Sequence, residues 1–121
     1  LEFRRVLFRS LLAVTEDAIR HNDQGRATAA IQRYGDRGYP VKQVFNLMLK
    51  YAVSEDGRLH GEKFYQTVRD EYRSTRPTFR WRQVVALARV TTSAYGYNRE
   101  DENGFRAAGY EDACKLLGVN S

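Results

Sequence analysis

Apolar residues recur every three or four positions along most of this 121-residue chain. That spacing places them on one side of an α-helix, and Ala27, Ala30, Ile31 and Tyr34 are a regular example. Alternating apolar and polar residues, which would indicate strands, are almost absent. The pattern therefore predicts an all-α protein with about six helices, which fall within residues 11–23, 24–40, 40–57, 58–75, 75–96 and 109–119.

Residues that typically begin and end helices stand between these segments. Asn22 and Asp23 predict the end of the first helix and the cap of the second. Gly35 and Gly38 are expected to end the second helix, and Pro40 suits the first turn of the third. Because the connections are short, we expect a compact antiparallel bundle or stacked helical hairpins. Hairpins of the tetratricopeptide kind are less favoured, since no repeat of about 34 residues recurs.

The segment 75–96 has apolar residues on nearly all of its sides. Only Arg82, Arg89 and Ser93 form a narrow polar stripe along it. A helix of this kind is typical of the centre of a helical domain. We therefore expect this helix to be the most buried element of the fold.

The first ten residues, LEFRRVLFRS, raise a separate question. Along their whole length they resemble the translation, in one frame, of the end of a widely used sequencing adapter. We therefore expect residues 1–10 to be an artefact that does not join the core. Residues 11–118 are then a single helical domain, and residues 119–121 are a tail. On this interpretation the natural N-terminus is missing and the domain is the C-terminal part of a longer protein.

Composition narrows the classes of function. The formal charge of the chain is +5, and it falls to +3 when Glu2, Arg4, Arg5 and Arg9 are set aside. A charge of that size does not indicate a nucleic-acid partner. No apolar run reaches the roughly 18 residues that a membrane span needs. The single cysteine, Cys114, cannot form an internal disulfide, which favours a reducing, cytoplasmic location.

The residues that could carry chemistry centre on His60. On a helical wheel His60, Phe64 and Glu71 share one edge of the apolar face of segment 58–75, and Gly61 would let another backbone come close. An imidazole in that position could ligate a metal or haem, or act as a base. It could equally be a hydrogen-bonded residue between helices.

A chemical site would also need a polar partner from another helix, because a lone imidazole neither holds a metal nor stays oriented. His21 has a structural alternative, since a histidine that ends a helix interacts favourably with the helix dipole. Metalloprotease, di-iron, dinucleotide and P-loop motifs are absent from the sequence. The candidate polar site consists of His60, Glu71, Tyr51 and His21, with Glu16 and Asp17 as further groups that could converge on it.

Residues 11–95 resemble the helical C-terminal region of certain uncharacterised bacterial proteins. The shared pattern is a small-residue helix, a glycine turn, an apolar helix, an acidic loop ending in glycine, and a helix with an early histidine. The counterparts here are residues 27–34, 35–38, 41–53, 54–57 and His60. Some of those proteins carry a Rieske-type ferredoxin module, whose paired Cys and His are absent from this sequence. The resemblance implies that an iron–sulfur cluster or another metal could belong to the missing upstream part.

Two functional interpretations follow. The first is an accessory or interaction domain of a larger cytoplasmic bacterial protein, whose partner is the missing upstream domain or another protein. One histidine and one cysteine within the core helices are too few for an acid–base pair, which favours this interpretation. The second is part of a metal- or haem-dependent redox protein that uses His60. The sequence leaves open whether the protein is an enzyme.

Overall fold

The described part of the chain is mostly helical and contains no strand. A computed structural model describes residues 2–52, 58–95, 115 and 117–119, and for residues 2–6 and 58–61 it describes the backbone only. This confirms the all-α class. Most of the predicted sixth helix, residues 109–119, lies outside the described residues. The described residues form five helices: α1 (Glu2–Arg20), α2 (Gln24–Asp36), α3 (Val41–Ala52), α4 (Arg58–Glu71) and α5 (Pro77–Ala94).

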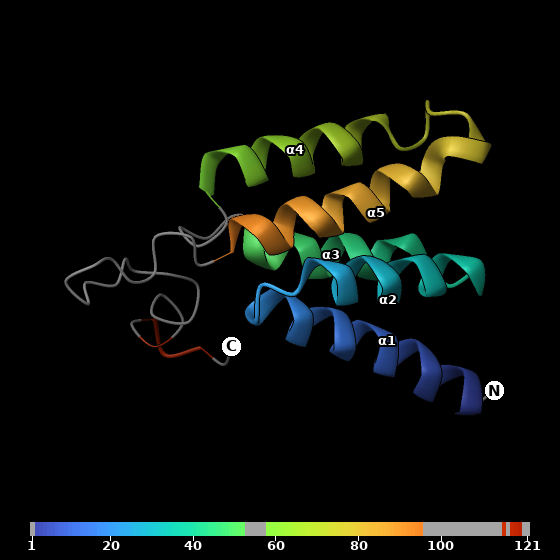
Figure 1. The fold of residues 1–121 in the computed structure, drawn as a ribbon, viewed down its shortest axis with the longest axis horizontal. Helices are drawn as coiled ribbons and strands as arrows, with labels where there is room; N and C mark the ends of the chain where they lie inside the picture. Colours follow the sequence, from blue (N-terminus) through green and yellow to red (C-terminus); the bar gives the residue numbers. More distant parts are fainter. Residues whose placement is uncertain (1, 53–57, 96–114, 116, 120–121) are drawn as a thin grey trace.

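Consecutive helices run in opposite directions and pack into a compact bundle (Figure 1). Helix α5 lies between α4 on one side and α2 and α3 on the other (Figure 1), and it contacts each of the other four helices. Its predicted central position is therefore confirmed. The expectation that it is the most buried element is wrong, because α2 buries five of its 13 residues and α5 five of its 18. Helix α2 is enclosed by both α1 and α5, whereas α5 keeps the exposed stripe of Arg82, Arg89 and Ser93.

The corner between α1 and α2 is closed by Asn22, as predicted. Asn22 has a φ of 54°, and the amides of Asn22 and Asp23 donate to the carbonyls of Ile19 and Ala18, at 3.1 and 2.8 Å. The Asp23 carboxylate then accepts from the amide of Arg26 at 3.0 Å and so caps α2. The side-chain amide of Asn22 also donates to the carbonyls of Thr92 and Tyr95, at 2.9 and 2.6 Å. One residue thus ends α1 and fastens the corner to the end of α5.

Gly38 ends α2 as predicted. Its φ is +70°, its amide donates to the carbonyl of Gly35 at 2.9 Å, and the Tyr39 amide donates to the carbonyl of Tyr34 at 3.3 Å. These two bonds satisfy carbonyls that the helix end would otherwise leave free. The rings of Tyr34 and Tyr39 then meet edge to face, 5.3 Å apart, and seal the helix end against the core.

Gly35 does not end α2, which corrects the sequence prediction. It lies inside the last turn of the helix, against the indole of Trp81 from α5. A Cβ at position 35 would lie 2.0 Å from Nε1 of Trp81, so no side chain fits there while the indole stays in place. The indole is held there because its Nε1 donates to the carbonyl of Ile31 at 2.9 Å and its ring stacks on Tyr34. The glycine therefore serves the contact between α2 and α5.

The core draws buried apolar side chains from every helix of the bundle. Tyrosine is prominent in it, because each ring buries a large apolar area while its hydroxyl still finds a polar partner. Complete burial of a large apolar side chain stabilises a fold by about 1.5–3 kcal/mol. The buried core residues are Ile19, Ile31, Tyr34, Tyr39, Val44, Met48, Tyr51, Ala52, Tyr65, Val68, Val84, Leu87, Ala88 and Tyr95.

Residues 2–10 belong to α1, and two of them reach the core. Leu7 and Phe8 are partly buried against it, and the ring of Phe8 lies 5.7 Å from Tyr34 and 5.9 Å from Tyr39. The expectation that residues 1–10 stay outside the core is therefore wrong for these two side chains. The physical reason is that Leu7 and Phe8 stand four residues before Leu11 and Leu12, so they extend the same apolar stripe by one turn. The adapter origin of the segment stays a prediction.

Candidate functional site

The candidate residues from the sequence lie in different parts of the bundle. His60 is in the first turn of α4, and its side chain lies outside the described part of the structure. Glu71 ends the same helix and is exposed, and its carbonyl accepts from the amides of Ser74 and Thr75 at 3.1 and 2.9 Å. His60 and Glu71 are eleven positions apart on this helix. At 1.5 Å per residue the gap is about 16 Å along the axis, too far for the two side chains to meet.

Tyr51 lies in the core near the end of α3. Its side chain is fully buried, its hydroxyl accepts from Nε of Arg20 at 3.1 Å, and its ring meets Tyr95 edge to face at 5.2 Å. Burial raises the pKa of the Tyr51 hydroxyl, and the negative charge of Glu16 adds to the shift. Glu16 itself accepts from Nζ of Lys50 at 3.2 Å. This cluster joins α1 to α3 with its charges paired.

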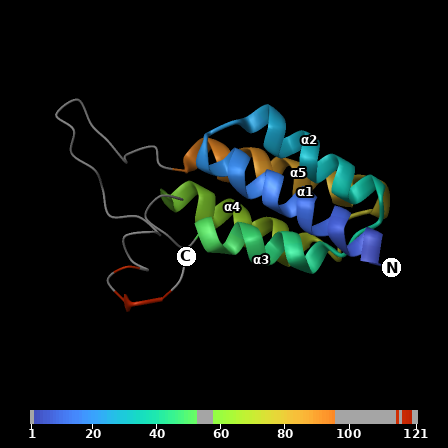
Figure 2. The same ribbon diagram turned by 90° about the horizontal axis from the view of Figure 1, so that it is seen from below.

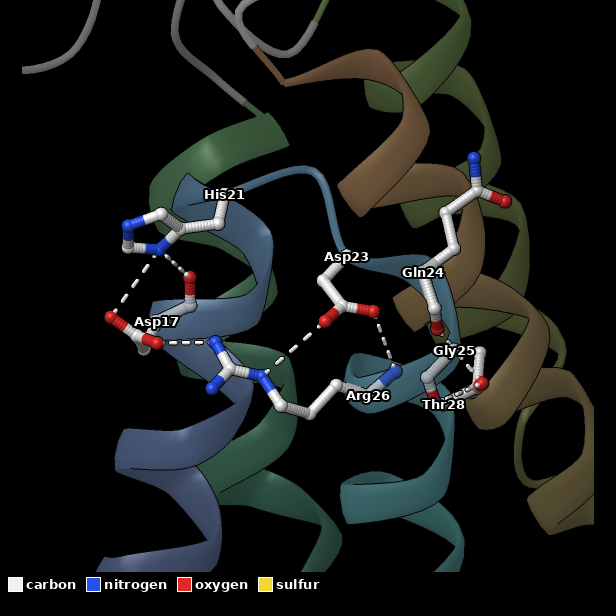
Figure 3. A network of polar contacts seen from close by, with 7 residues as sticks. All are labelled: Asp17, His21, Asp23, Gln24, Gly25, Arg26 and Thr28. Carbon is white, nitrogen blue, oxygen red and sulfur yellow. Dashed lines mark hydrogen bonds and ion pairs between the residues drawn. The ribbon is translucent and has the colours of Figure 1, made fainter.

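His21 belongs to a polar network at the corner between α1 and α2 (Figure 3). Its Nδ1 lies 2.8 Å from the Asp17 carbonyl oxygen and 3.4 Å from the Asp17 carboxylate, and the residue is exposed. Asp17 also accepts from the guanidinium of Arg26, which is paired with Asp23 at 3.7 Å. The network therefore links the end of α1 to the start of α2. Figure 1 shows that α4 ends at the opposite end of the bundle, so Glu71 is remote from it.

Metal binding can be examined for the residues that the structure describes. Within them, no group of three or more His, Cys, Asp and Glu residues could hold a metal ion. The side chain of His60 and all of Cys114 fall outside that part of the chain. The metal interpretation of His60 accordingly stays a prediction.

A groove between α3 and α4 offers a different site, which the sequence did not predict. Figure 2 shows the two helices side by side along one edge of the bundle. The groove has a volume of about 500 Å³. The residues that line it are Val41, Lys42, Phe45, Asn46, Leu49, Tyr65, Arg69, Tyr72 and Arg73.

The floor of this α3–α4 groove is aromatic. The ring of Phe45 on α3 meets two rings of the facing wall edge to face, Tyr65 at 6.1 Å and Tyr72 at 5.6 Å. Leu49 stands one turn further along α3 and keeps 37% of its surface exposed. Burial raises the pKa of the Tyr65 hydroxyl, although the positive charge of Arg69 opposes that shift. The floor is therefore an open apolar surface on which an apolar side chain would gain contact area.

The rim of the groove carries only positive charge. Lys42, Arg69 and Arg73 are all exposed, and no carboxylate lines the groove. Among the described residues, none of the three forms an ion pair within 4.0 Å. The hollow between α1 and α3 differs, since there Lys50 is paired with Glu16. The α3–α4 groove thus combines an apolar floor with unneutralised cations.

Arg80 on α5 supports the α4 side of the groove. Its Nη2 donates to the carbonyls of Arg73 and Thr75, at 3.1 and 3.2 Å. Its guanidinium carbon lies 5.2 Å from the ring centre of Tyr72. These contacts hold the backbone of the turn after α4 in place, and with it the positions of Tyr72 and Arg73 beside the groove.

The width of the apolar face of α3 was the feature that could have revealed the groove. The sequence places Val41, Val44, Phe45, Met48, Leu49 and Ala52 on one wide face. In the structure that face divides into two stripes. Val44, Met48 and Ala52 are buried in the core, whereas Val41, Phe45 and Leu49 line the groove. A face wider than one core contact needs indicates a second contact surface.

Comparisons with protein-family models, with curated proteins and with solved structures give no match.

Proposed function

We propose that this chain is an interaction domain and that its α3–α4 groove docks a segment of a partner protein. The domain would serve as an accessory part of a larger bacterial cytoplasmic protein. The observation that carries the proposal is the aromatic floor of Phe45, Tyr65 and Tyr72 beneath a rim whose three cations have no partner in the described chain. Aromatic residues and arginine are the groups that dominate the binding energy of protein interfaces.

Two properties of the groove would favour the binding of a partner. Apolar surface left in water is unfavourable by about 25 cal/mol per Å², so covering the floor supplies binding energy. The cations of the rim repel one another in the free domain, and a partner of opposite charge would relieve that repulsion. The volume of about 500 Å³ is within the range of ligand-binding clefts in proteins.

An unbiased selection tests this proposal. A display library of random peptides of about 16 residues is selected on the immobilised full chain. Dissociation constants of the selected peptides are then measured for the wild type, for Leu49→Arg in the groove and for Ala29→Arg. Ala29 is exposed on α2, which does not line the groove, so its variant is the matched control.

We expect Leu49→Arg to weaken the selected peptides by roughly tenfold or more, because it places a large charged side chain on the apolar end of the floor. Ala29→Arg should leave their affinity unchanged. Binders that tolerate Leu49→Arg as well as Ala29→Arg, or a selection that yields no binder, would overturn the proposed function.

A metal- or haem-dependent redox role through His60 is the alternative proposal. Its ligands would include residues beyond the described part of the chain, since the described part holds no ligand group of three. Elemental analysis and visible absorption of the purified protein test it directly. Metal or haem that is bound by the wild type and lost from His60→Ala would support this role, and a metal-free wild type would reject it.

A further inference from the structure

We infer that the occupant of the α3–α4 groove is an amphipathic helix of a partner protein, with acidic residues in its first turn. This inference rests on the proposed function, and it adds the conformation, the charge and the direction of the bound segment. Each of the three follows from a different property of the groove.

The conformation follows from the lack of backbone partners in the groove. Its walls are two helices, whose amides and carbonyls are bonded within each helix except in the first turn of α3 and the last turn of α4. The described chain contains no strand whose edge could pair with an extended peptide. An extended segment on this aromatic floor would lose water from its amides and carbonyls without replacement, which is costly. A helix satisfies these groups internally and presents only side chains.

The spacing of the floor also suits a helix. Val41, Phe45 and Leu49 follow one another at intervals of four residues, so they form a continuous, slightly inclined apolar stripe that extends about 12 Å along α3. That length corresponds to roughly two helical turns. An apolar stripe of three side chains on a partner helix, spaced by three or four residues, would lie along it.

The charge of the occupant follows from the rim. Lys42, Arg69 and Arg73 provide three exposed cations and the lining provides no carboxylate, so a segment with several Asp or Glu residues complements the groove. A basic or neutral helix would leave the repulsion among these cations unrelieved. The same rim that attracts acidic amphipathic helices therefore excludes basic ones.

The direction follows from where the cations lie. Helices α3 and α4 run antiparallel, so the start of α3 faces the end of α4 (Figure 2). Lys42 and Arg73 therefore share one end of the groove, Arg69 stands one turn further in, and Leu49 marks the apolar end. Carboxylates are favoured in the first turn of a helix, where they also meet the positive end of its dipole. The occupant accordingly begins at the Lys42 end and runs parallel to α3.

The peptides from the selection described above provide the probe. Their affinities are measured for Arg69→Gln/Arg73→Gln and for Arg33→Gln/Arg89→Gln, which removes the same charge from exposed positions outside the groove. We expect the selected peptides to be rich in Asp and Glu near their N-termini, to gain helicity on binding, and to weaken roughly tenfold or more only with the first variant. Circular dichroism of the mixture reports the helicity.

Orientation has its own measurement. A nitroxide placed at the N-terminus of a selected peptide should broaden the amide resonances around Lys42 and Arg73, and one at its C-terminus those around Leu49. The reverse pattern would overturn the parallel direction.

The outcomes separate this inference from the proposed function. Peptides that require Leu49 but lack acidic residues, remain extended, or bind Arg69→Gln/Arg73→Gln as tightly as the wild type would overturn the inference and leave the docking function standing. Peptides that bind Leu49→Arg as tightly as the wild type would overturn both.

Three other occupants of the groove would also overturn the inference. Tight DNA or RNA binding lost in Arg69→Gln/Arg73→Gln would make the groove a nucleic-acid site, and a dimer dissolved by Leu49→Arg would make it a self-association surface. Much tighter peptide binding when residues 100–102 (Glu-Asp-Glu) are neutralised would identify the chain's own acidic stretch as the occupant.

Discussion

Buried threonines show how single polar atoms are accommodated inside this bundle. Thr15 and Thr92 are fully buried, and their hydroxyls donate to the carbonyls four residues earlier, Leu11 at 2.7 Å and Ala88 at 2.7 Å. Thr91 is buried to a similar degree, yet its Oγ1 has no hydrogen-bond partner in the described chain. An unpaired buried hydroxyl costs about 1–3 kcal/mol. Within the described chain, the hydroxyl of Thr91 is therefore a buried polar group without a compensating hydrogen bond.

Replacing Thr91 by Val should stabilise the protein by about 1 kcal/mol, because valine keeps the shape and removes the unpaired hydroxyl. Urea unfolding monitored by circular dichroism measures the change. Thr92→Val is the matched control on the same helix, and it should destabilise by about 1 kcal/mol or less since it removes a bond that is formed. Loss of stability in Thr91→Val would show that its hydroxyl has a partner after all.

At the scale of single elements, α1 is one continuous helix across residue 10, where the predicted adapter segment would end. Its first half comes from residues that resemble an adapter, yet Leu7 and Phe8 continue the apolar stripe of Leu11 and Leu12. A helix propagates at little cost once its first turn exists, so any segment with suitable spacing can extend it. Packing against Tyr34 and Tyr39 then follows from geometry, whatever the origin of the residues.

Phe8→Ala should therefore destabilise the fold by about 2 kcal/mol, roughly half of the loss expected for a fully buried ring. Arg9→Ala changes the neighbouring exposed residue and should alter the free energy of unfolding by less than about 0.5 kcal/mol. Equal effects of the two variants in urea unfolding would mean that the first turns of α1 do not contribute to the core.

Helix α3 shows how far the sequence predicts a site. The periodicity of α3 and the stop at Gly38 depend on neighbours in the chain, so both could be predicted and both are confirmed. The division of its wide face into a core stripe and a groove stripe depends on where α4 lies, and that is set by tertiary packing. The role of Gly35 could not be predicted for the same reason, because it depends on Trp81, which is 46 residues away in the chain.

At the scale of the whole molecule, the core contains several buried tyrosines, among them the fully buried Tyr34 and Tyr51. The hydroxyl of Tyr34 donates a hydrogen bond to the carbonyl of Pro40 at 2.6 Å, and the hydroxyl of Tyr51 accepts one from Arg20. Burial raises the pKa of both hydroxyls above their ordinary value near 10, and the neighbouring Tyr39 and Glu16, respectively, add to the shift. The folded state therefore keeps two protons that the unfolded chain releases in alkali.

Stability should fall as the pH rises above about 10, since the folded state then binds more protons than the unfolded state. Below pH 10 these two groups are neutral in both states and their contribution is fully present. Urea midpoints measured between pH 8 and 11 test this, with Tyr34→Phe/Tyr51→Phe as the comparison. The double variant should be less stable at pH 8 but should lose stability more slowly in alkali. Parallel curves for the two proteins would contradict the assignment.

The contact between Gly35 and Trp81 also constrains how this protein can change over time. While the indole occupies the space beside position 35, any substitution of the glycine by a larger residue is excluded, and selection acts on both positions together. Once Trp81 is replaced by a smaller side chain, position 35 can accept alanine or serine, both of which favour a helix more than glycine does. Divergent copies of this gene should therefore show the two positions changing in a fixed order, with 81 first.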